Sequence, residues 1–151
     1  MLFRSGEVPL VLQALVYPML DDRTGTTILP PRFIGAVGWD AQANAFGWRA
    51  FLHAPPARPG AASAGVPFRV PSAAGLPPAF IGVGGIDLFM REDVEYAKRL
   101  SLANVPVELL VVPGAYHAFD RVVPQAALSQ MFARALRNAL RRAFGIPAAQ
   151  A

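Results

Sequence analysis

Two histidines and a few carboxylates are the side chains that could carry acid–base chemistry here. His117 lies in PGAYHAFD, just after the apolar segment 107–112, and Asp87 closes IGVGGID, just after the apolar segment 79–83. The other histidine, His53, precedes a pair of prolines. Ligands of open α/β sheets bind beyond the carboxyl ends of the strands. Asp87 and His117 are therefore expected at such an edge, whereas His53 is not.

An aspartate beside a histidine has a defined chemical use. A carboxylate that accepts the Nδ1 proton of an imidazole fixes its tautomer and stabilises its cation, and a general base needs both. Two strand ends of one parallel sheet can bring Asp87 and His117 together in this way. A structural role for a lone histidine is the other interpretation, and the two residues by themselves leave both open.

The elements that must position this pair are strands and helices, which are expected to alternate along the chain. Nearly unbroken apolar runs predict strands that are buried in a sheet, and apolar residues at three- and four-residue spacing predict helices. A long region rich in Pro, Ala and Gly is expected to be a surface loop. Such alternation favours an α/β fold with about three parallel strands, flanking helices and a long closing helix. The expected strands are 10–17, 79–83 and 107–112, the helices are 91–103 and 123–144 with short helical pieces in 31–52, and the loop is 53–78.

Helix 91–103 is expected to be amphipathic. Its spacing turns one set of side chains inward and another toward water. The inward set is Val94, Ala97, Leu100 and Leu102, and the outward set is Glu95, Lys98 and Arg99.

The first strand, 10–17, raises a question of completeness. Its sequence LVLQALVY is apolar on both faces. No other segment is an evident partner for its far edge, and an exposed apolar edge is a docking or aggregation liability. We therefore expect that part of the fold lies upstream of Met1, and that self-association through this strand is possible.

Composition restricts the class of protein. The chain has 151 residues, the size of one domain, and 54% of them are hydrophobic. It has no cysteine, which excludes a disulfide framework, a thiolate nucleophile and a Cys-based metal site. The glycines of 82–85 lack the spacing for dinucleotide binding, and two histidines without clustered carboxylates do not favour a metal site. We expect no cofactor and no metal.

Charge and hydropathy indicate little about partners. The net charge is +4, and four arginines gather near the C-terminus: Arg134, Arg137, Arg141 and Arg142. A solvated helix face explains these arginines better than a nucleic-acid site, since no nucleic-acid motif accompanies them. Binding to an anionic surface is the alternative. The apolar run near the N-terminus is too short to cross a bilayer and has no cleavage site, so a cytoplasmic protein without a membrane span is expected.

The stretch 75–120 resembles the C-terminal signature of the hormone-sensitive-lipase-like esterases, also called α/β-hydrolase fold-3. The sequence GGID at 84–87, followed by Leu88 and Glu92, is similar to the family's Gly-x-x-Asp-x-Leu-x-x-Glu pattern. The sequence GAYHAF at 114–119 is similar to its Gly-x-x-His-Gly-Phe pattern. The resemblance implies that Asp87 is the acid and His117 the base of a catalytic triad, in the family's chain order.

The resemblance also extends upstream, over EVPL at 7–10, YPMLDD at 17–22 and the segment 44–48. It implies that residues 1–151 are a single domain, the C-terminal portion of an α/β-hydrolase catalytic domain. Two positions depart from the family. Arg91 stands where an acidic residue is usual, and Ala118 where glycine is usual, so that a Cβ enters the loop that presents the histidine.

The nucleophile is the main departure. This type of esterase uses a Gly-x-Ser-x-Gly elbow and an upstream oxyanion loop, and the sequence contains neither. The nearest string, GAASAG at 60–65, has one residue too many before Ser63 and lies in a Pro-rich loop. Ser63 is therefore a weak candidate.

The resemblance implies hydrolysis of a carboxylic ester with a short to medium acyl chain. The chain would supply the triad acid and histidine, and alone it is expected to be inactive or weak. The alternative is an inactive truncated remnant that acts, if at all, through partner binding or self-association.

Overall fold

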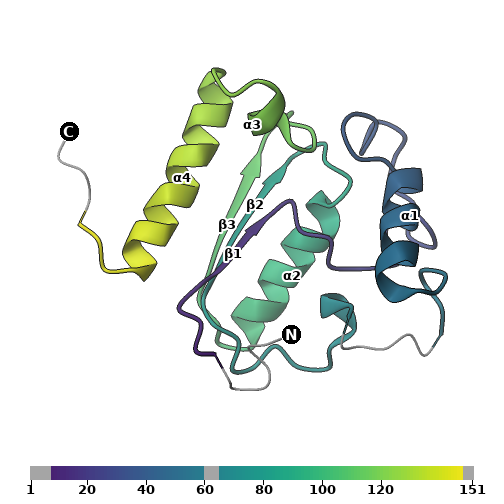
Figure 1. Cartoon of the computed structure of the whole chain (residues 1–151), viewed down its shortest axis with the longest axis horizontal. Coiled ribbons are helices and arrows are strands. Elements are labelled where there is room, and N and C mark those ends of the chain that lie inside the picture. Colours follow the sequence, from purple (N-terminus) through teal and green to yellow (C-terminus); the bar gives the residue numbers. More distant parts are fainter. Residues whose placement is uncertain (1–7, 60–64, 148–151) are drawn as a thin grey trace.

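A parallel three-stranded sheet forms the centre of the structure, with helices on both of its faces (Figure 1). The computed structural model describes residues 8–59 and 65–147. The strand order is β1-β2-β3, which agrees with the α/β fold predicted from the sequence. The elements are β1 (Gln13–Val16), α1 (Ala41–Leu52), the 3₁₀ turn η2 (Pro67–Arg69), β2 (Ala79–Gly84), α2 (Met90–Leu102), β3 (Val107–Val112), α3 (Phe119–Val122) and α4 (Ala127–Ala143).

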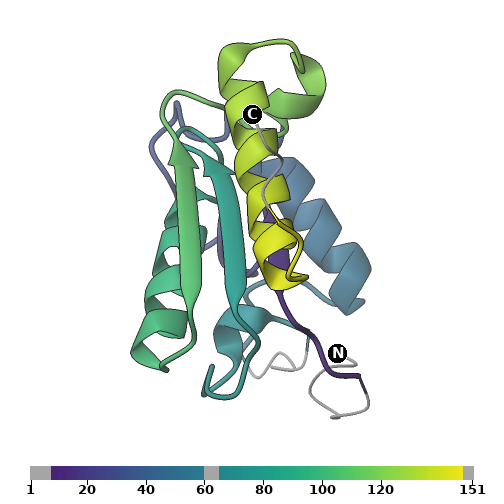
Figure 2. The same ribbon diagram turned by 90° about the vertical axis from the view of Figure 1, so that its left-hand side faces the viewer.

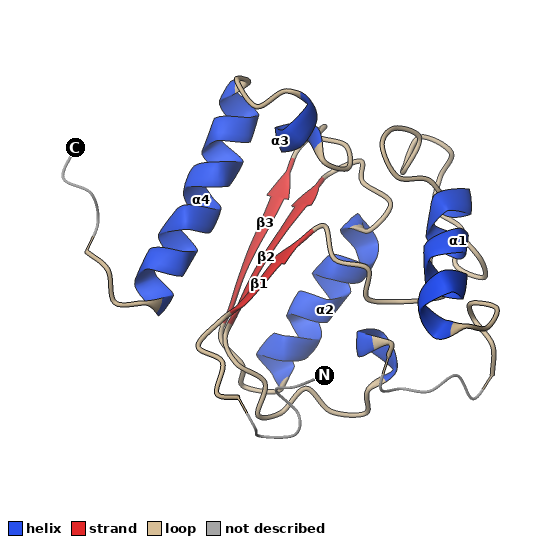
Figure 3. Cartoon of the chain, in the orientation of Figure 1, coloured by secondary structure: helices blue, strands red, loops and turns tan. Residues whose placement is uncertain are grey.

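The register of the sheet brings all three carboxyl ends to one edge. Gln13 is level with Ala79 at the start of β1, and Ala79 is level with Val107 at the start of β3. β2 and β3 stay paired up to Gly84 and Val112. The segments that follow the three strands therefore leave the sheet side by side (Figure 3).

Strand β2 is the middle of the core. Every one of its residues is buried, because α2 covers one face of the sheet and α4 the other (Figure 2). On the α2 face, Ile81 packs with Tyr96 and Leu100 in a cluster of buried hydrophobic residues. On the α4 face, Gly82 makes room for a ring: a Cβ at this position would lie 2.6 Å from Phe132 Cε2. β2 is thus held between α2 and α4.

Strand β1 differs from its prediction. The unbroken apolar run predicted a strand buried on both faces, but the strand is only half-buried and Ala14 is exposed. The reason is its place in the sheet: among the described residues, β1 pairs with β2 alone and its other edge has no neighbour.

The helices also differ from their predictions in detail. In α2, Ala97 and Leu100 are buried as expected, but Val94 is 38% and Leu102 80% exposed. The buried face instead includes Glu92, Asp93 and Tyr96. The closing helix predicted from 123 begins only at Ala127, after the short α3. Pro124 explains the break, because proline disfavours a helical conformation in the residue before it.

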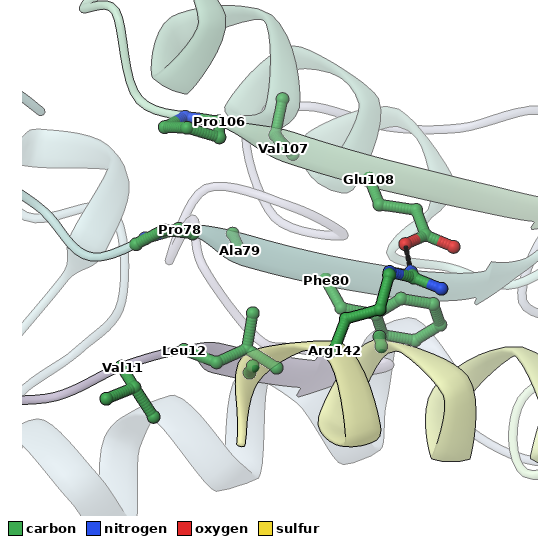
Figure 4. Close-up of a pocket in the computed structure, with 11 residues that line it drawn as sticks. Val11, Leu12, Pro78, Ala79, Phe80, Pro106, Val107, Glu108 and Arg142 are labelled. Atoms are coloured by element: carbon green, nitrogen blue, oxygen red, sulfur yellow. Dashed lines mark hydrogen bonds and ion pairs between the residues drawn. The ribbon is translucent and has the colours of Figure 1, made fainter. Parts of the chain in front are cut away.

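A shallow groove opens at the amino ends of the strands (Figure 4). Its volume is about 380 Å³, and it lies between the sheet and the last turns of α4. An ion pair between Arg142 and Glu108 crosses it. This groove lies at the opposite end of the strands from Asp87 and His117. Of the helices in the described ranges, none is long and apolar enough to cross a membrane.

Candidate active site

Asp87 and His117 contact each other beyond the carboxyl ends of β2 and β3. Nδ1 of His117 lies 3.0 Å from Oδ2 of Asp87. The Asp87 side chain is fully buried, and 19% of the His117 side chain is exposed. A buried carboxylate beside a partly exposed imidazole is an arrangement that can orient the ring and leave its other nitrogen accessible.

The turn after β2 holds Asp87. The backbone N–H of Asp87 donates to the carbonyl of Gly84 over 3.2 Å, which closes the turn. Oδ1 of Asp87 accepts the backbone N–H of Phe89 over 3.0 Å. Because Oδ1 is engaged by the chain's own backbone, Oδ2 is directed to the imidazole of His117.

The loop after β3 carries His117 across the end of β2. A Cβ at Gly84 would lie 2.3 Å from the carbonyl oxygen of Ala115, so this crossing depends on glycine. The residue after the histidine, Ala118, has the left-handed conformation, with φ 61° and ψ 25°. This conformation favours glycine, and here an alanine adopts it. Ala118, which stands where the family usually has glycine, is thus a strained residue next to the imidazole.

Three aromatic rings surround His117. The ring centroids of Tyr17, Phe89 and Trp39 lie 5.1, 5.5 and 5.8 Å from that of the imidazole. Trp39 comes from the loop between β1 and α1, which sequence reasoning did not assign to the site. The preceding residue, Gly38, allows this approach: its φ is +88°, and a Cβ there would lie 2.6 Å from the carbonyl oxygen of His117.

Tyr17 links the first strand to the histidine loop. Its hydroxyl donates a 2.8 Å hydrogen bond to Oδ1 of Asp120, in α3. Burial, followed by the carboxylate of Asp120, raises the pKa of Tyr17 above its ordinary value. The phenol therefore stays protonated and remains a donor. Tyr17 follows the carboxyl end of β1, so the rule that located Asp87 and His117 could have located this residue too.

Two further buried carboxyls lie at the start of α2. Glu92 accepts the backbone N–H groups of Leu20 and Asp21, and also the hydroxyl of Thr24. Burial is the largest cause that raises the pKa of Glu92 to about 7. Burial, then Glu92 and Asp87, raise the pKa of Asp93 to about 10. Asp93 is thus neutral near pH 7, so it adds no second negative charge beside Asp87.

The remaining sequence candidates are not part of this contact. His53 is an exposed residue that ends α1 in a left-handed conformation. Ser63 lies outside the described residues. Asp21 and Asp22, in the turn after β1, form ion pairs with Arg23 and Arg69. No group of three or more His, Asp or Glu side chains that could hold a metal ion occurs in residues 8–59 or 65–147.

A family model described as the alpha/beta hydrolase fold matches residues 1–121. The chain belongs to this family. The match confirms the family resemblance and the partial α/β-hydrolase fold predicted from the sequence. It includes Asp87 and His117, and it ends within α3.

Solved hydrolase structures agree with this assignment. The esterase LipW from Mycobacterium marinum is 34% identical, with a TM-score of 0.74 over 90% of this chain and 41% of that one. A bacterial heroin esterase is 31% identical, with a TM-score of 0.83 over 94% of this chain and 45% of that one. An esterase from Pyrobaculum calidifontis, at 23% identity and a TM-score of 0.67, shares the fold over 91% of this chain and 46% of that one.

This hydrolase-family chain therefore spans less than half of the length of each of these esterases. The comparison with curated proteins found no significant match.

Proposed function

We propose that this chain supplies the acid and the base of a serine-hydrolase triad that cleaves carboxylic esters. The observation that carries the proposal is the 3.0 Å contact between Nδ1 of His117 and Oδ2 of the buried Asp87. Membership of the alpha/beta hydrolase family and the similarity to esterases support it. The hormone-sensitive-lipase type and a short to medium acyl chain remain part of the proposal.

The chemistry assigned to each residue follows from this contact. With Nδ1–H donated to Asp87, Nε2 of His117 carries the lone pair that accepts a proton from a serine hydroxyl as it attacks the ester carbonyl. The buried carboxylate stabilises the imidazolium formed at that point. His117 then donates the proton to the departing alcohol. The serine and the oxyanion donors are proposed to come from outside these 151 residues.

Hydrolysis of p-nitrophenyl acetate and butyrate by the purified chain, beside His117→Ala, tests where the nucleophile lies. We expect no turnover above background in either protein. Ester hydrolysis that the His117→Ala variant loses would place a nucleophile within the chain and contradict this part of the proposal. Ser63→Ala would then be the next variant.

A chimera tests the roles of the two residues directly. This chain would replace the matching part of the M. marinum esterase, which retains its own remaining half. We expect measurable esterase activity, a loss of roughly 10⁴-fold with Asp87→Asn, and a loss at least as large with His117→Ala. His53→Ala is the matched histidine control and should retain activity. An active chimera that tolerates His117→Ala, or a folded chimera without activity, would contradict the proposed triad roles.

A second candidate function is non-catalytic binding through β1. The observation in its favour is that β1 has no neighbour on its outer edge among the described residues. The apolar residues that precede it, Leu10 and Val11, are exposed. A binding remnant of this kind should self-associate with rising concentration in light scattering. A stable monomer at every concentration would rule it out.

A further inference from the structure

An apolar cavity of about 340 Å³ lies beside the candidate active site. It is formed where the segment after β1, the Trp39 loop and α1 meet. The side chains around it are almost entirely apolar, and three of them are aromatic. The lining includes Met19, Trp39, Trp48, Phe51 and Pro67, with Gly47 on the inner side of α1.

Trp39 connects this cavity to the imidazole. Its ring lines the cavity and also lies 5.8 Å from the ring of His117. The indole of Trp39 therefore lies between a group bound in the cavity and the imidazole that is proposed to move the proton. Because the cavity and the surroundings of His117 share this side chain, we assign the cavity to the apolar part of a substrate whose ester reaches His117.

The walls of the cavity are suited to a flat ring. Trp48 and Phe51 meet edge to face, with centroids 6.1 Å apart at an angle of 68°. Aromatic rings prefer offset or edge-to-face contact with one another, and the thioether of Met19 adds a favourable sulfur–aromatic contact. Ligand pockets range over about 300–1,000 Å³, so this one is small. Its size matches one or two fused rings better than a long acyl chain.

Gly47 keeps the cavity open. A Cβ at this position would meet Met19 Cε and Trp39 Cζ2 at 3.4 Å, and any longer side chain would continue into the cavity. Glycine in a helix interior costs stability relative to alanine. The contact distances would permit alanine here, so steric crowding does not require glycine. The extra cavity volume that glycine leaves is a reason for its presence.

We infer that this cavity binds the aromatic group of an aryl-bearing ester. This inference rests on the proposed function, since it names the substrate class of the same site. It makes Trp39, Trp48 and Gly47 specificity-determining residues, and it assigns them no part in the chemical step.

Intrinsic fluorescence of the purified chain tests binding without any need for turnover. Trp39 and Trp48 are the only tryptophans of the sequence, and both line the cavity. Titration with methyl benzoate or benzyl acetate, which place the ring in the acid or in the alcohol, should give a saturable change in emission for at least one ester. The saturated analogues, methyl cyclohexanecarboxylate and cyclohexylmethyl acetate, should bind about two- to tenfold more weakly.

Substitutions on α1 locate the site. Gly47→Leu should abolish the saturable change, because its side chain fills the cavity, and Gly47→Ala should weaken binding by a smaller factor. Ala50→Leu places the same side chain on the exposed face of the same helix and should bind as the original chain does. Circular dichroism of each variant would show whether the helix content is retained.

Three results would overturn the inference: no saturable change with either aromatic ester, equal affinity for the saturated analogues, or unchanged binding in a folded Gly47→Leu variant. These results are distinct from a failure of the proposed function. Loss of the triad role would appear as a chimera that is inactive or indifferent to His117→Ala, while the aromatic esters still bind.

Discussion

The hydroxyl of Tyr17 donates a 2.8 Å hydrogen bond to Oδ1 of Asp120 across 103 residues of sequence. Tyr17 directly follows β1, and Asp120 lies three residues after His117. The ring of Tyr17 also packs against the imidazole and stacks on Phe132, at an interplanar angle of 10°. One side chain thus connects the edge strand, the histidine loop and α4.

Tyr17→Phe removes this hydrogen bond and keeps the ring. We expect the free energy of unfolding to fall by about 1.5–3 kcal/mol, because the bond has a carboxylate acceptor and Asp120 is left with fewer partners. Urea denaturation measures the change. Tyr116→Phe, on the same loop, is the control and should stay within about 0.5 kcal/mol. Equal losses in both variants would show that the link to Asp120 contributes nothing specific.

The neutral imidazole of His117 should be the Nδ1–H tautomer. Its Nδ1 faces the carboxylate Oδ2 of Asp87 at 3.0 Å, and a carboxylate accepts a proton but donates none. Nitrogen-15 NMR at a pH where both histidines are neutral distinguishes the two ring nitrogens, and His53 gives the exposed reference signal. Asp87→Asn should reduce the Nδ1–H preference. If His117 and His53 show the same tautomer mixture, the contact does not orient the ring in solution.

Ala118→Gly should stabilise the chain. Ala118 has φ 61°, and the left-handed region costs a non-glycine residue about 1–2 kcal/mol. Part of the gain is offset because glycine has more freedom in the unfolded chain, so we expect a net increase of about 0.5–1 kcal/mol. Thermal unfolding measures it. Ala115→Gly, in the same loop but without a positive φ, should instead lower the stability, and a gain there would contradict the strain argument.

The buried carboxyl of Asp93 should make stability fall as pH rises. Burial first, then Glu92 and Asp87, raise its pKa from 3.8 to about 10 in the folded chain. Between these values the unfolded chain has released a proton that the folded chain still holds. The contribution of Asp93 is therefore complete below about pH 4 and is lost progressively up to about pH 10.

Asp93→Asn removes this proton and keeps the shape of the side chain. We expect a higher free energy of unfolding at pH 8 than the original chain has, and a flatter dependence between pH 5 and pH 9, both measured by urea denaturation. Glu95→Gln, on the exposed side of α2, is the control. An unchanged pH dependence in Asp93→Asn would mean that the carboxyl is hydrated or ionised in the folded chain.

Apolar runs predicted β2 and β3, and these two strands pair with each other along their whole length. The run 79–83 became β2 almost residue for residue, and 107–112 is β3 without change. The segment 10–17 shortened to β1, since apolar content predicts burial only when a neighbour covers the strand. Val94 and Leu102 have the spacing of an inner face, but Glu92 and Asp93 occupy that face, and the partners of Glu92 come from the distant segment after β1.

The candidate site was predictable to the extent that it follows strand ends. Asp87 and His117 could be placed together because parallel strands finish at one edge. Trp39 could not, because its loop reaches the imidazole only through the packing of Gly38 against the backbone of His117. No local pattern in the sequence indicates that contact, which joins residues 79 positions apart.

Asp87 and His117 lie 30 residues apart, after the first and the second strand of a single unit of strand, helix and strand. The two backbone segments that carry them, with the close approach at Gly84 and the turn at Gly114, lie within residues 79–120. A crossover placed before residue 79 would therefore transfer the acid and the base together, and the segments around Tyr17 and Trp39 that pack on the imidazole would come from the other parent.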